Sequence, residues 1–466
     1  MSRVIGNYNP PRMKRLALVL LFSLTACVTA PPPKPAEPVH IVIVGTTDLH
    51  GWFNGHDQET KQGIPDTRYG GVATLASYID ALRAENNGNV VVVDSGDMWQ
   101  GTLESNLPEG EPVVLAYNTI GYAASAVGNH EFDYGPIGPG VIADEPGEDP
   151  FGVLKRNASL AKFPFLSANM IEKTTGQTPS WAKRYTMVTV AGVRIGIIGL
   201  STPDTPNVTI PVNVRTLSFT DPVAATVSAA SELRAQGADA VIVIAHIGGR
   251  CRDLSDPRDT SSCDNSQEVM DYLGKMPAGT IDAWFAGHTH SQMRQFINDV
   301  PTVQSLAYSN EFSTMDLWVD PTAKRVISDR TVMRPPTMIC TSVFAGTETC
   351  DVRKAKPGAT LVPRVFAGRT ITPDARVAAA IQPALAAVEA KRNEPLGITT
   401  TAPIIRNYSR ESALGDLITD AMRAVFGGDI AMFNSGGIRA NLPAGDLKYS
   451  DLFEVSPFDN YPAIVM

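Results

Sequence analysis

The stretch IVIVGTTDLHG, residues 41–51, decides the fold, because it joins a strand directly to two potential metal ligands. Its first four residues are apolar and β-branched, which is typical of a strand buried on both faces of a sheet. Asp48 and His50 follow, and side chains two positions apart can point the same way and bind one ion. On its own, however, an Asp-x-His pair in a loop is more often a surface feature than a metal site.

The same arrangement recurs along the chain. Further apolar, β-branched runs lie at residues 90–93, 194–200, 240–245 and 281–286. Helical patterns separate several of them, for example residues 71–84 and 221–236. This alternation predicts an α/β fold. Ligands of open α/β sheets bind outside the carboxyl ends of the strands, so polar residues that follow parallel strands should meet at one edge.

Seven candidate metal ligands follow these runs or lie in glycine-flanked turns. They are Asp48, His50, Asp97, Asn129, His246, His288 and His290. Taken singly, most have an ordinary interpretation, such as a turn at Asp97 or a satisfied core histidine at His246. Together they share one topological position and offer nitrogen and oxygen, which favours Zn²⁺ or Mn²⁺ over calcium or a thiolate site. Seven ligands are enough for two divalent ions that share one carboxylate.

A candidate catalytic pair lies in the stretch GNHEFD, residues 128–133. His130 and Asp133 are three positions apart and therefore neighbours on a helical turn. An aspartate beside a histidine is the usual means of fixing the tautomer of a catalytic imidazole. The alternative is a capped helix start that carries a surface histidine.

The first residues read as an export signal. A basic start at residues 13–15 precedes a short apolar run at 16–24, and Leu-Thr-Ala-Cys at 24–27 resembles a bacterial lipoprotein signal with Cys27 as the lipidated residue. An ordinary signal peptide with a chance cysteine is the alternative. Residues 28–38 are a proline-rich linker. We therefore expect an exported protein, anchored by lipid to the cell envelope at the periplasmic face of the outer membrane or at the cell surface.

The remaining cysteines form two close pairs, Cys251 with Cys263 and Cys340 with Cys350. Export places them in an oxidising compartment, so we expect two disulfides that staple loops. A structural zinc site is the alternative, although no Cys-x-x-Cys spacing supports it.

The composition indicates a folded protein that does not coat nucleic acid. Hydrophobic residues make up 43% of the chain, which supplies enough apolar surface for a core. The formal net charge is −9, whereas a protein that binds nucleic-acid polymers is usually basic. A phosphate ligand would need local cations. The sequence carries no signal for an oligomeric state.

The seven candidate metal ligands and the GNHEFD stretch, taken in their order along the chain, resemble the motifs of the calcineurin-like metallophosphoesterases. The likeness is strongest to the secreted 5′-nucleotidase branch, which includes UDP-sugar hydrolase. The resemblance implies a four-layer α/β/β/α sandwich over residues 39–338. It further implies a connector and linker helix over 339–395 and a partial α/β nucleotide-binding domain over 396–466, after the signal peptide at 1–27.

The resemblance also implies a role for each ligand. One ion would be held by Asp48, His50, Asp97 and His290. The second would be held by Asp97, Asn129, His246 and His288, with Asp97 bridging the two. His130, oriented by Asp133, would stabilise charge on the phosphate and assist the leaving oxygen.

The C-terminal segment resembles the nucleotide-binding part of the family. The implied substrate residues are Arg406, Arg410, Asn434, Gly436, Gly437, Arg439 and Phe458, with Phe458 stacking on the base. The second stacking ring and the ribose carboxylate of the family would lie beyond residue 466. Since residues 462–466 form an apolar, strand-like run, we expect a truncated domain.

The expected activity is hydrolysis of nucleoside 5′-monophosphates to nucleoside and phosphate, with UDP-sugar hydrolysis as a further activity. The alternatives are a 2′,3′-cyclic-nucleotide phosphodiesterase with 3′-nucleotidase activity, and a thiosulfate-ester hydrolase of the same architecture. A catalytically impaired nucleotide-binding lipoprotein is the alternative from outside the enzymes. The metal motifs specify the ester chemistry rather than the leaving group, so they do not separate the enzymes.

Overall fold

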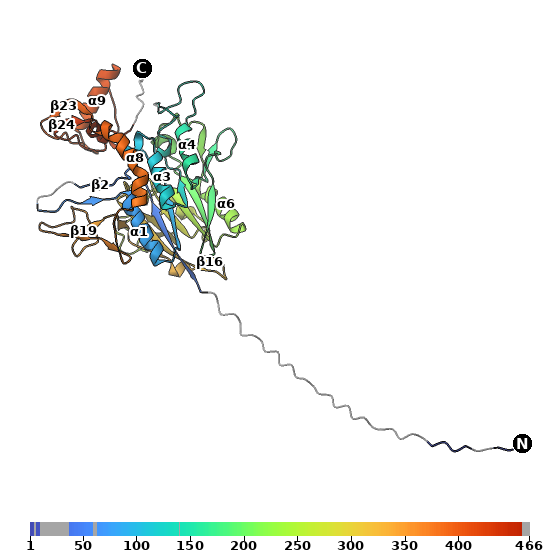
Figure 1. The fold of residues 1–466 in the computed structure, drawn as a ribbon. Coiled ribbons are helices and arrows are strands. Elements are labelled where there is room, and N and C mark those ends of the chain that lie inside the picture. Colours follow the sequence, from blue (N-terminus) through green and yellow to red (C-terminus); the bar gives the residue numbers. More distant parts are fainter. Residues whose placement is uncertain (4–5, 10–36, 59–62, 139, 459–466) are drawn as a thin grey trace. The chain divides into compact units, whose positions relative to one another are not determined.

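A computed structural model describes residues 1–3, 6–9, 37–58, 63–138 and 140–458 of the chain (Figure 1). The chain divides into two units, Met1–Ala36 and Glu37–Met466, and the described residues of the first unit form neither helix nor strand. Cys27, most of the predicted signal peptide and linker, and the apolar run at 462–466 lie outside the described residues. Within the described part of the chain, no helix has the length and apolar character needed to cross a bilayer.

The first sheet of the second unit is built around β1 (Val39–Thr46). This strand pairs in parallel with β4 (Val90–Asp94) and antiparallel with β15 (Glu311–Asp320). The sheet continues through β5 (Ala124–Ala126) and β6 (Phe165–Leu166) on one side. On the other side, β15 also pairs with β16 (Arg325–Val326), β17 (Val332–Met333) and β18 (Thr337–Met338).

The second sheet has a parallel centre and antiparallel edges. Its strands run in the order β13 (Met293–Ile297), β14 (Val300–Gln304), β12 (Ala283–Ala286), β11 (Ala240–His246), β9 (Val193–Ser201) and β8 (Tyr185–Val190). The pairs β12–β14, β11–β12 and β9–β11 are parallel. Both sheets thus contain the parallel strands expected from the apolar runs.

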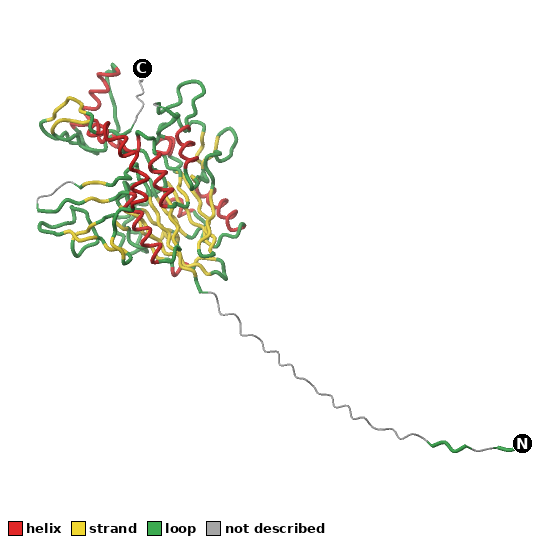
Figure 2. Tube along the Cα trace, in the orientation of Figure 1, coloured by secondary structure: helices red, strands yellow, loops and turns green. Residues whose placement is uncertain are grey.

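The two sheets pack face to face with helices outside them, which confirms the expected α/β/β/α sandwich (Figure 2). Ile41 and Ile43 of β1 face Ile195 and Ile197 of β9 in the core between the sheets. On the outer face of the first sheet lie α1 (Val72–Glu85) and α3 (Glu111–Ile120), and on that of the second sheet lie α6 (Pro222–Ala235) and α7 (Glu268–Lys275).

Short elements surround the two sheets. They are β2 (His56–Asp57), β3 (Arg68–Tyr69), α2 (Leu103–Asn106), η1 (His130–Phe132), α4 (Gly152–Leu160), β7 (Met170–Glu172), α5 (Thr205–Val208), β10 (Leu217–Phe219) and η2 (Ser328–Arg330). The connector contains β19 (Ser342–Phe344), β20 (Leu361–Pro363), β21 (Val365–Phe366) and β22 (Arg369–Thr370). Disulfides join Cys251 to Cys263 and Cys340 to Cys350, which confirms the predicted pairs.

The C-terminal segment begins with α8 (Ala375–Arg392), a helix that contains Pro383 and packs on α3 and α1 (Figure 1). It is followed by β23 (Pro395–Thr400), α9 (Ala413–Phe426), η3 (Ser435–Gly437), β24 (Gly445–Lys448) and α10 (Tyr449–Val455). These elements share a small core that includes Leu414, Ile438 and Leu447. The domain limits given by the sequence stay predictions.

The apolar run at residues 430–433 of the sequence predicts a strand, but the structure has none there, so this prediction is wrong. The apolar pattern is present, but β23 pairs with β24, and no described strand lies beside residues 430–433. Ile430 and Met432 are consequently 82% and 86% exposed. A strand needs a hydrogen-bonding neighbour, which the local pattern alone does not supply.

Glycine at position 199 lets the two sheets approach each other. A methyl group on Gly199 of β9 would overlap the backbone of Leu166 in β6. Gly199→Ala is therefore expected to lower the free energy of unfolding by about 1–3 kcal/mol, measured by urea denaturation. Gly274→Ala is the control, since Gly274 lies in α7 with open space around it and the change should be neutral or slightly stabilising. Equal stability of the two variants would contradict the close approach.

Candidate metal centre

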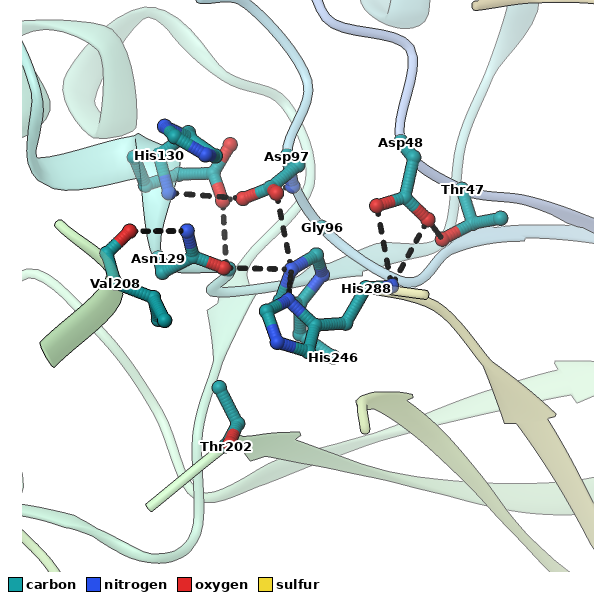
Figure 3. Close-up of polar contacts among 12 residues, drawn as sticks. Thr47, Asp48, Gly96, Asp97, Asn129, His130, Thr202, Val208, His246 and His288 are labelled. Atoms are coloured by element: carbon teal, nitrogen blue, oxygen red, sulfur yellow. Dashed lines mark hydrogen bonds and ion pairs between the residues drawn. The ribbon is translucent and has the colours of Figure 1, made fainter. Parts of the chain in front are cut away.

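The predicted metal ligands and the predicted catalytic residue His130 meet where the parallel strands of both sheets end. They are Asp48 and His50 after β1, Asp97 after β4, Asn129 and His130 after β5, His246 at the end of β11, and His288 and His290 after β12. Figure 3 shows side chains from several of these loops directed toward one another. The sequence position common to all of them, immediately after an apolar run, thus becomes a common position in space.

Three overlapping groups of side chains have ligand atoms within 4.8 Å of one another. The groups are Asp48 with His50 and His290, His50 with Asp97 and His130, and Asp97 with His246 and His288. Asp97 belongs to two of the groups and therefore lies between the others. All donors are nitrogen or oxygen, as divalent zinc or manganese prefers.

The geometry around His50 fits a cation. Its Nδ1 lies 2.7 Å from the backbone carbonyl of Gln100, and because a carbonyl only accepts, the proton of the neutral ring is on Nδ1. The Nε2 lone pair then faces Nε2 of His290 at 3.0 Å and Oδ2 of Asp97 at 3.6 Å. Burial lowers the pKa of His50 well below its usual value, which keeps the ring neutral and able to bind a metal.

His246 is held in the same way as His50, with Nδ1 at a backbone carbonyl and Nε2 toward the cluster. Its Nδ1 lies 2.9 Å from the carbonyl of Ser95, so Nε2 faces Oδ2 of Asp97 at 3.0 Å and Oδ1 of Asn129 at 3.0 Å. The amide of Asn129 is oriented by donation from Nδ2 to the carbonyl of Val208 (Figure 3). Burial lowers the pKa of His246, but the charge and hydrogen bond of Asp97, together with the charges of Asp48 and Glu131, raise it to about 10. These carboxylates thus favour positive charge at this point.

Two buried carboxylates behind the ligands hold their loops. Glu131 accepts hydrogen bonds from the backbone N–H groups of Asp97, Met98 and Gly128 at 2.6–2.9 Å. Asp94 accepts from the N–H of Gly96 at 2.9 Å. Neither was identified from the sequence as a functional residue, although Glu131 lies within the GNHEFD stretch. The signal for such a residue is a single acidic side chain inside an otherwise polar loop, which is weak.

His130 and Asp133 form the expected pair. Nδ1 of His130 lies 2.5 Å from Oδ2 of Asp133, whose other oxygen accepts from the Thr209 hydroxyl at 2.8 Å. Burial lowers the pKa of His130, but Asp133 and Asp97 raise it to about 9. The pair therefore presents a protonated imidazole next to the cluster, and this group can stabilise negative charge or donate a proton.

A cavity of about 550 Å³ opens beside His50. It is lined by residues of both segments, among them Trp52, Tyr308, Arg406, Arg439 and Phe458. The Arg439 guanidinium lies 4.7 Å over the Phe458 ring and donates to the Tyr308 hydroxyl at 3.2 Å. Three predicted substrate residues, Arg406, Arg439 and Phe458, are thus brought to the cavity.

The other predicted substrate residues lie elsewhere. Arg410 is exposed, and Asn434 is exposed with its side chain accepting from the N–H of Gly437 at 2.8 Å, where it caps η3. Neither Arg410, Asn434, Gly436 nor Gly437 lines the cavity. Trp52 and Tyr308 do line it, although no sequence signal marked either of them.

Side chains of the loop after β4 and of α2 hold the segment that carries Phe458. Gln100 and Asn106 both donate from their amides to the carbonyl of Pro457, at 2.9 and 3.0 Å. Arg392 of α8 also pairs with Glu104 of α2. These contacts fix the position of the C-terminal residues that form one wall of the cavity.

Two family profiles match the chain. The profile of the calcineurin-like phosphoesterases matches residues 41–292, and that of the 5′-nucleotidase C-terminal domain matches residues 390–466. The first match runs from β1 past the end of β12 and includes every strand-end ligand, and the second covers the segment that carries Arg406, Arg439 and Phe458.

The chain is also similar to proteins from several bacteria. It is 27% identical over 434 residues to endonuclease YhcR of Bacillus subtilis, with 91% of this chain and 32% of that protein covered. It is 26% identical to a cell wall protein of Listeria monocytogenes, with 97% and 58% covered. The chain thus spans less than two thirds of either relative. A 5′-nucleotidase of Vibrio cholerae is 26% identical, with 97% and 78% covered.

Solved structures share the fold. A 5′-nucleotidase precursor from Thermus thermophilus superposes with a TM-score of 0.66 at 24% identity, over 90% of this chain and 74% of that chain. The sulfate thiohydrolase SoxB of Thermus thermophilus superposes with a TM-score of 0.61 at 16% identity, over the same shares of the two chains. At these identities the likeness concerns the fold.

Asp97 is the residue whose loss should affect both ends of the cluster. Asp97→Asn keeps the shape but removes the charge, so we expect the affinity for Zn²⁺ or Mn²⁺ to fall by more than roughly tenfold, measured by calorimetric titration of chelator-treated protein. Asp253→Asn is the control, because Asp253 is exposed on a distant loop. Wild-type affinity in Asp97→Asn would contradict the shared-carboxylate arrangement.

Proposed function

Because the chain belongs to the calcineurin-like phosphoesterase family, we propose that it is a metal-dependent phosphoesterase that hydrolyses nucleoside 5′-monophosphates to nucleoside and phosphate. One observation carries the proposal. The buried cluster around Asp97 opens on a cavity whose walls bear Arg406, Arg439 and the Phe458 ring. Such a cavity offers charge for a phosphate next to an apolar surface for a base.

The proposed ligand sets follow the distances. Asp48, His50, Asp97 and His290 would hold one divalent cation, and Asp97, Asn129, His246 and His288 would hold the second. Two such cations, zinc, manganese or similar, supply a nucleophile at neutral pH and neutralise charge on the phosphoryl group.

The remaining groups act on the substrate directly. His130, held by Asp133, would donate its proton to the leaving 5′-oxygen and stabilise charge on the phosphoryl oxygens. Arg439 would hold the nucleotide, and Arg406 supports it from the same wall. Phe458 would stack on the base. Arg410 and Asn434 could serve only after a movement of the C-terminal segment, since both lie off the cavity.

We further propose that the protein is exported and held at the cell envelope by lipid on Cys27. The support is the lipoprotein-like pattern at residues 24–27 together with two disulfides, which form in oxidising compartments. Metabolic labelling with a radioactive fatty acid tests the anchor, and a Cys27→Ala variant that keeps the label would contradict it.

Hydrolysis assays on metal-loaded protein test the activity, with phosphate release measured for AMP and 3′-AMP and product chromatography used for the other esters. We expect AMP to be hydrolysed with a higher kcat/KM than 3′-AMP, cyclic 2′,3′-AMP, UDP-glucose or thiosulfate esters. A preference for 3′-AMP and cyclic 2′,3′-AMP would support the phosphodiesterase alternative instead. Protein that binds metal but hydrolyses none of these esters would support the impaired nucleotide-binding lipoprotein.

Phe458 is expected to contribute to binding of the base and not to the chemistry. Stacking is worth about 1–3 kcal/mol per base, so Phe458→Ala should raise KM for AMP by roughly five- to 150-fold and leave KM for ribose 5-phosphate nearly unchanged. Phe453→Ala is the matched control, because the Phe453 ring stacks on Tyr449 and does not line the cavity. Equal effects of Phe458→Ala on both substrates would refute the stacking role.

A further inference from the structure

One wall of the cavity is a stack of three aromatic rings. The Trp52 ring lies on His56, with centroids 3.8 Å apart and planes inclined by 16°, and His56 lies on Tyr69 at 4.8 Å and 14°. The short hairpin of β2 and β3 fixes this arrangement, since His56 and Tyr69 are directly opposite each other in its register. Trp52 is the outermost ring and lines the cavity.

The stack is locked in place and uncharged. Nε2 of His56 lies 2.6 Å from the carbonyl of Tyr308, and since a carbonyl accepts, Nε2 is the protonated nitrogen. Burial lowers the pKa of His56 to about 4, so the ring is neutral at physiological pH. Trp52 therefore rests on a rigid apolar support and need not be ordered when a ligand arrives, which removes an entropic cost of binding.

The second face of the Trp52 ring is uncovered by any other ring or cation among the described residues. The nearest further ring, that of Tyr308, is inclined by 59° at 6.1 Å and does not stack on it. The Tyr308 ring in turn lies 5.1 Å from that of His290. A flat group placed on Trp52 is thus separated from the metal ligands by a single aromatic ring.

We propose that Trp52 is a stacking platform for the aromatic base of the substrate, provided by the phosphoesterase segment itself. This rests on the proposed nucleotide hydrolysis. An aromatic base is the ligand class that fits, because it extends a neutral stack of parallel rings and buries a large flat surface. Trp52 adds to the proposed stacking of Phe458, whose ring has the Arg439 guanidinium at 4.7 Å and the His130 ring at 5.6 Å.

Steady-state kinetics of the full-length, metal-loaded protein test the platform. Trp52→Ala should raise KM for AMP by roughly five- to 150-fold while KM for ribose 5-phosphate and kcat stay near wild type, and Trp52→Phe should restore most of the loss. Trp318→Ala is the control, because Trp318 also stacks on a histidine, His40, at 4.5 Å but does not line the cavity. Equal loss with both substrates, or no loss with AMP, would overturn the platform.

Binding of adenosine separates this inference from the activity. Adenosine should quench the tryptophan fluorescence of the wild-type protein, Trp52→Phe should abolish that quench, and Trp318→Phe should keep it. This result supports the platform even if no ester is hydrolysed, in which case the proposed function fails alone. A quench that persists in Trp52→Phe places the base elsewhere and overturns the platform even if AMP is hydrolysed.

Discussion

Buried negative charge without a permanent cation is the constraint on which the structure depends. Asp48 and Asp97 are 0% and 1% exposed, and within the described part of the chain neither forms an ion pair with lysine or arginine. An isolated buried carboxylate is costly, so positive charge must be provided where the imidazoles face it. The effect is visible at His246, whose pKa is raised to about 10, mainly by the charge of Asp97. Divalent ions would supply this positive charge and leave the imidazoles neutral.

The backbone of the strand-end loops is strained at the ligand residues. Asp48, His50, Asp97, His288 and His290 all have φ between 49° and 78°, a region that side chains other than glycine rarely adopt. Each such residue costs about 1–3 kcal/mol and persists only where its surroundings fix it. The parallel strands fix one end of each loop, and the buried glutamate that accepts three backbone N–H groups fixes two loops to each other. Contacts within the protein therefore hold the ligand loops in position.

The sequence predicts most of the sandwich and the meeting of its ligands, because both depend on apolar runs followed by polar residues. It does not predict the Trp52 stack, since that depends on which residues of the short strands β2 and β3 lie opposite each other. It also misses Tyr308, whose position follows from a strained turn rather than from a motif. The strand predicted at residues 430–433 is wrong because an apolar pattern carries no information on its neighbours. The sequence also does not show that four predicted substrate residues lie away from the cavity, because their position depends on how the C-terminal segment packs. These residues are Arg410, Asn434, Gly436 and Gly437.

Gln100 contacts both a metal-ligand candidate, His50, and the segment that carries Phe458. Its backbone carbonyl faces Nδ1 of His50, and its side-chain amide holds the carbonyl of Pro457. The imidazole tautomer and the seat of the Phe458 ring are thus set by opposite ends of the same residue. Exchange of the C-terminal segment therefore removes a hydrogen-bond partner from the same residue whose carbonyl faces His50.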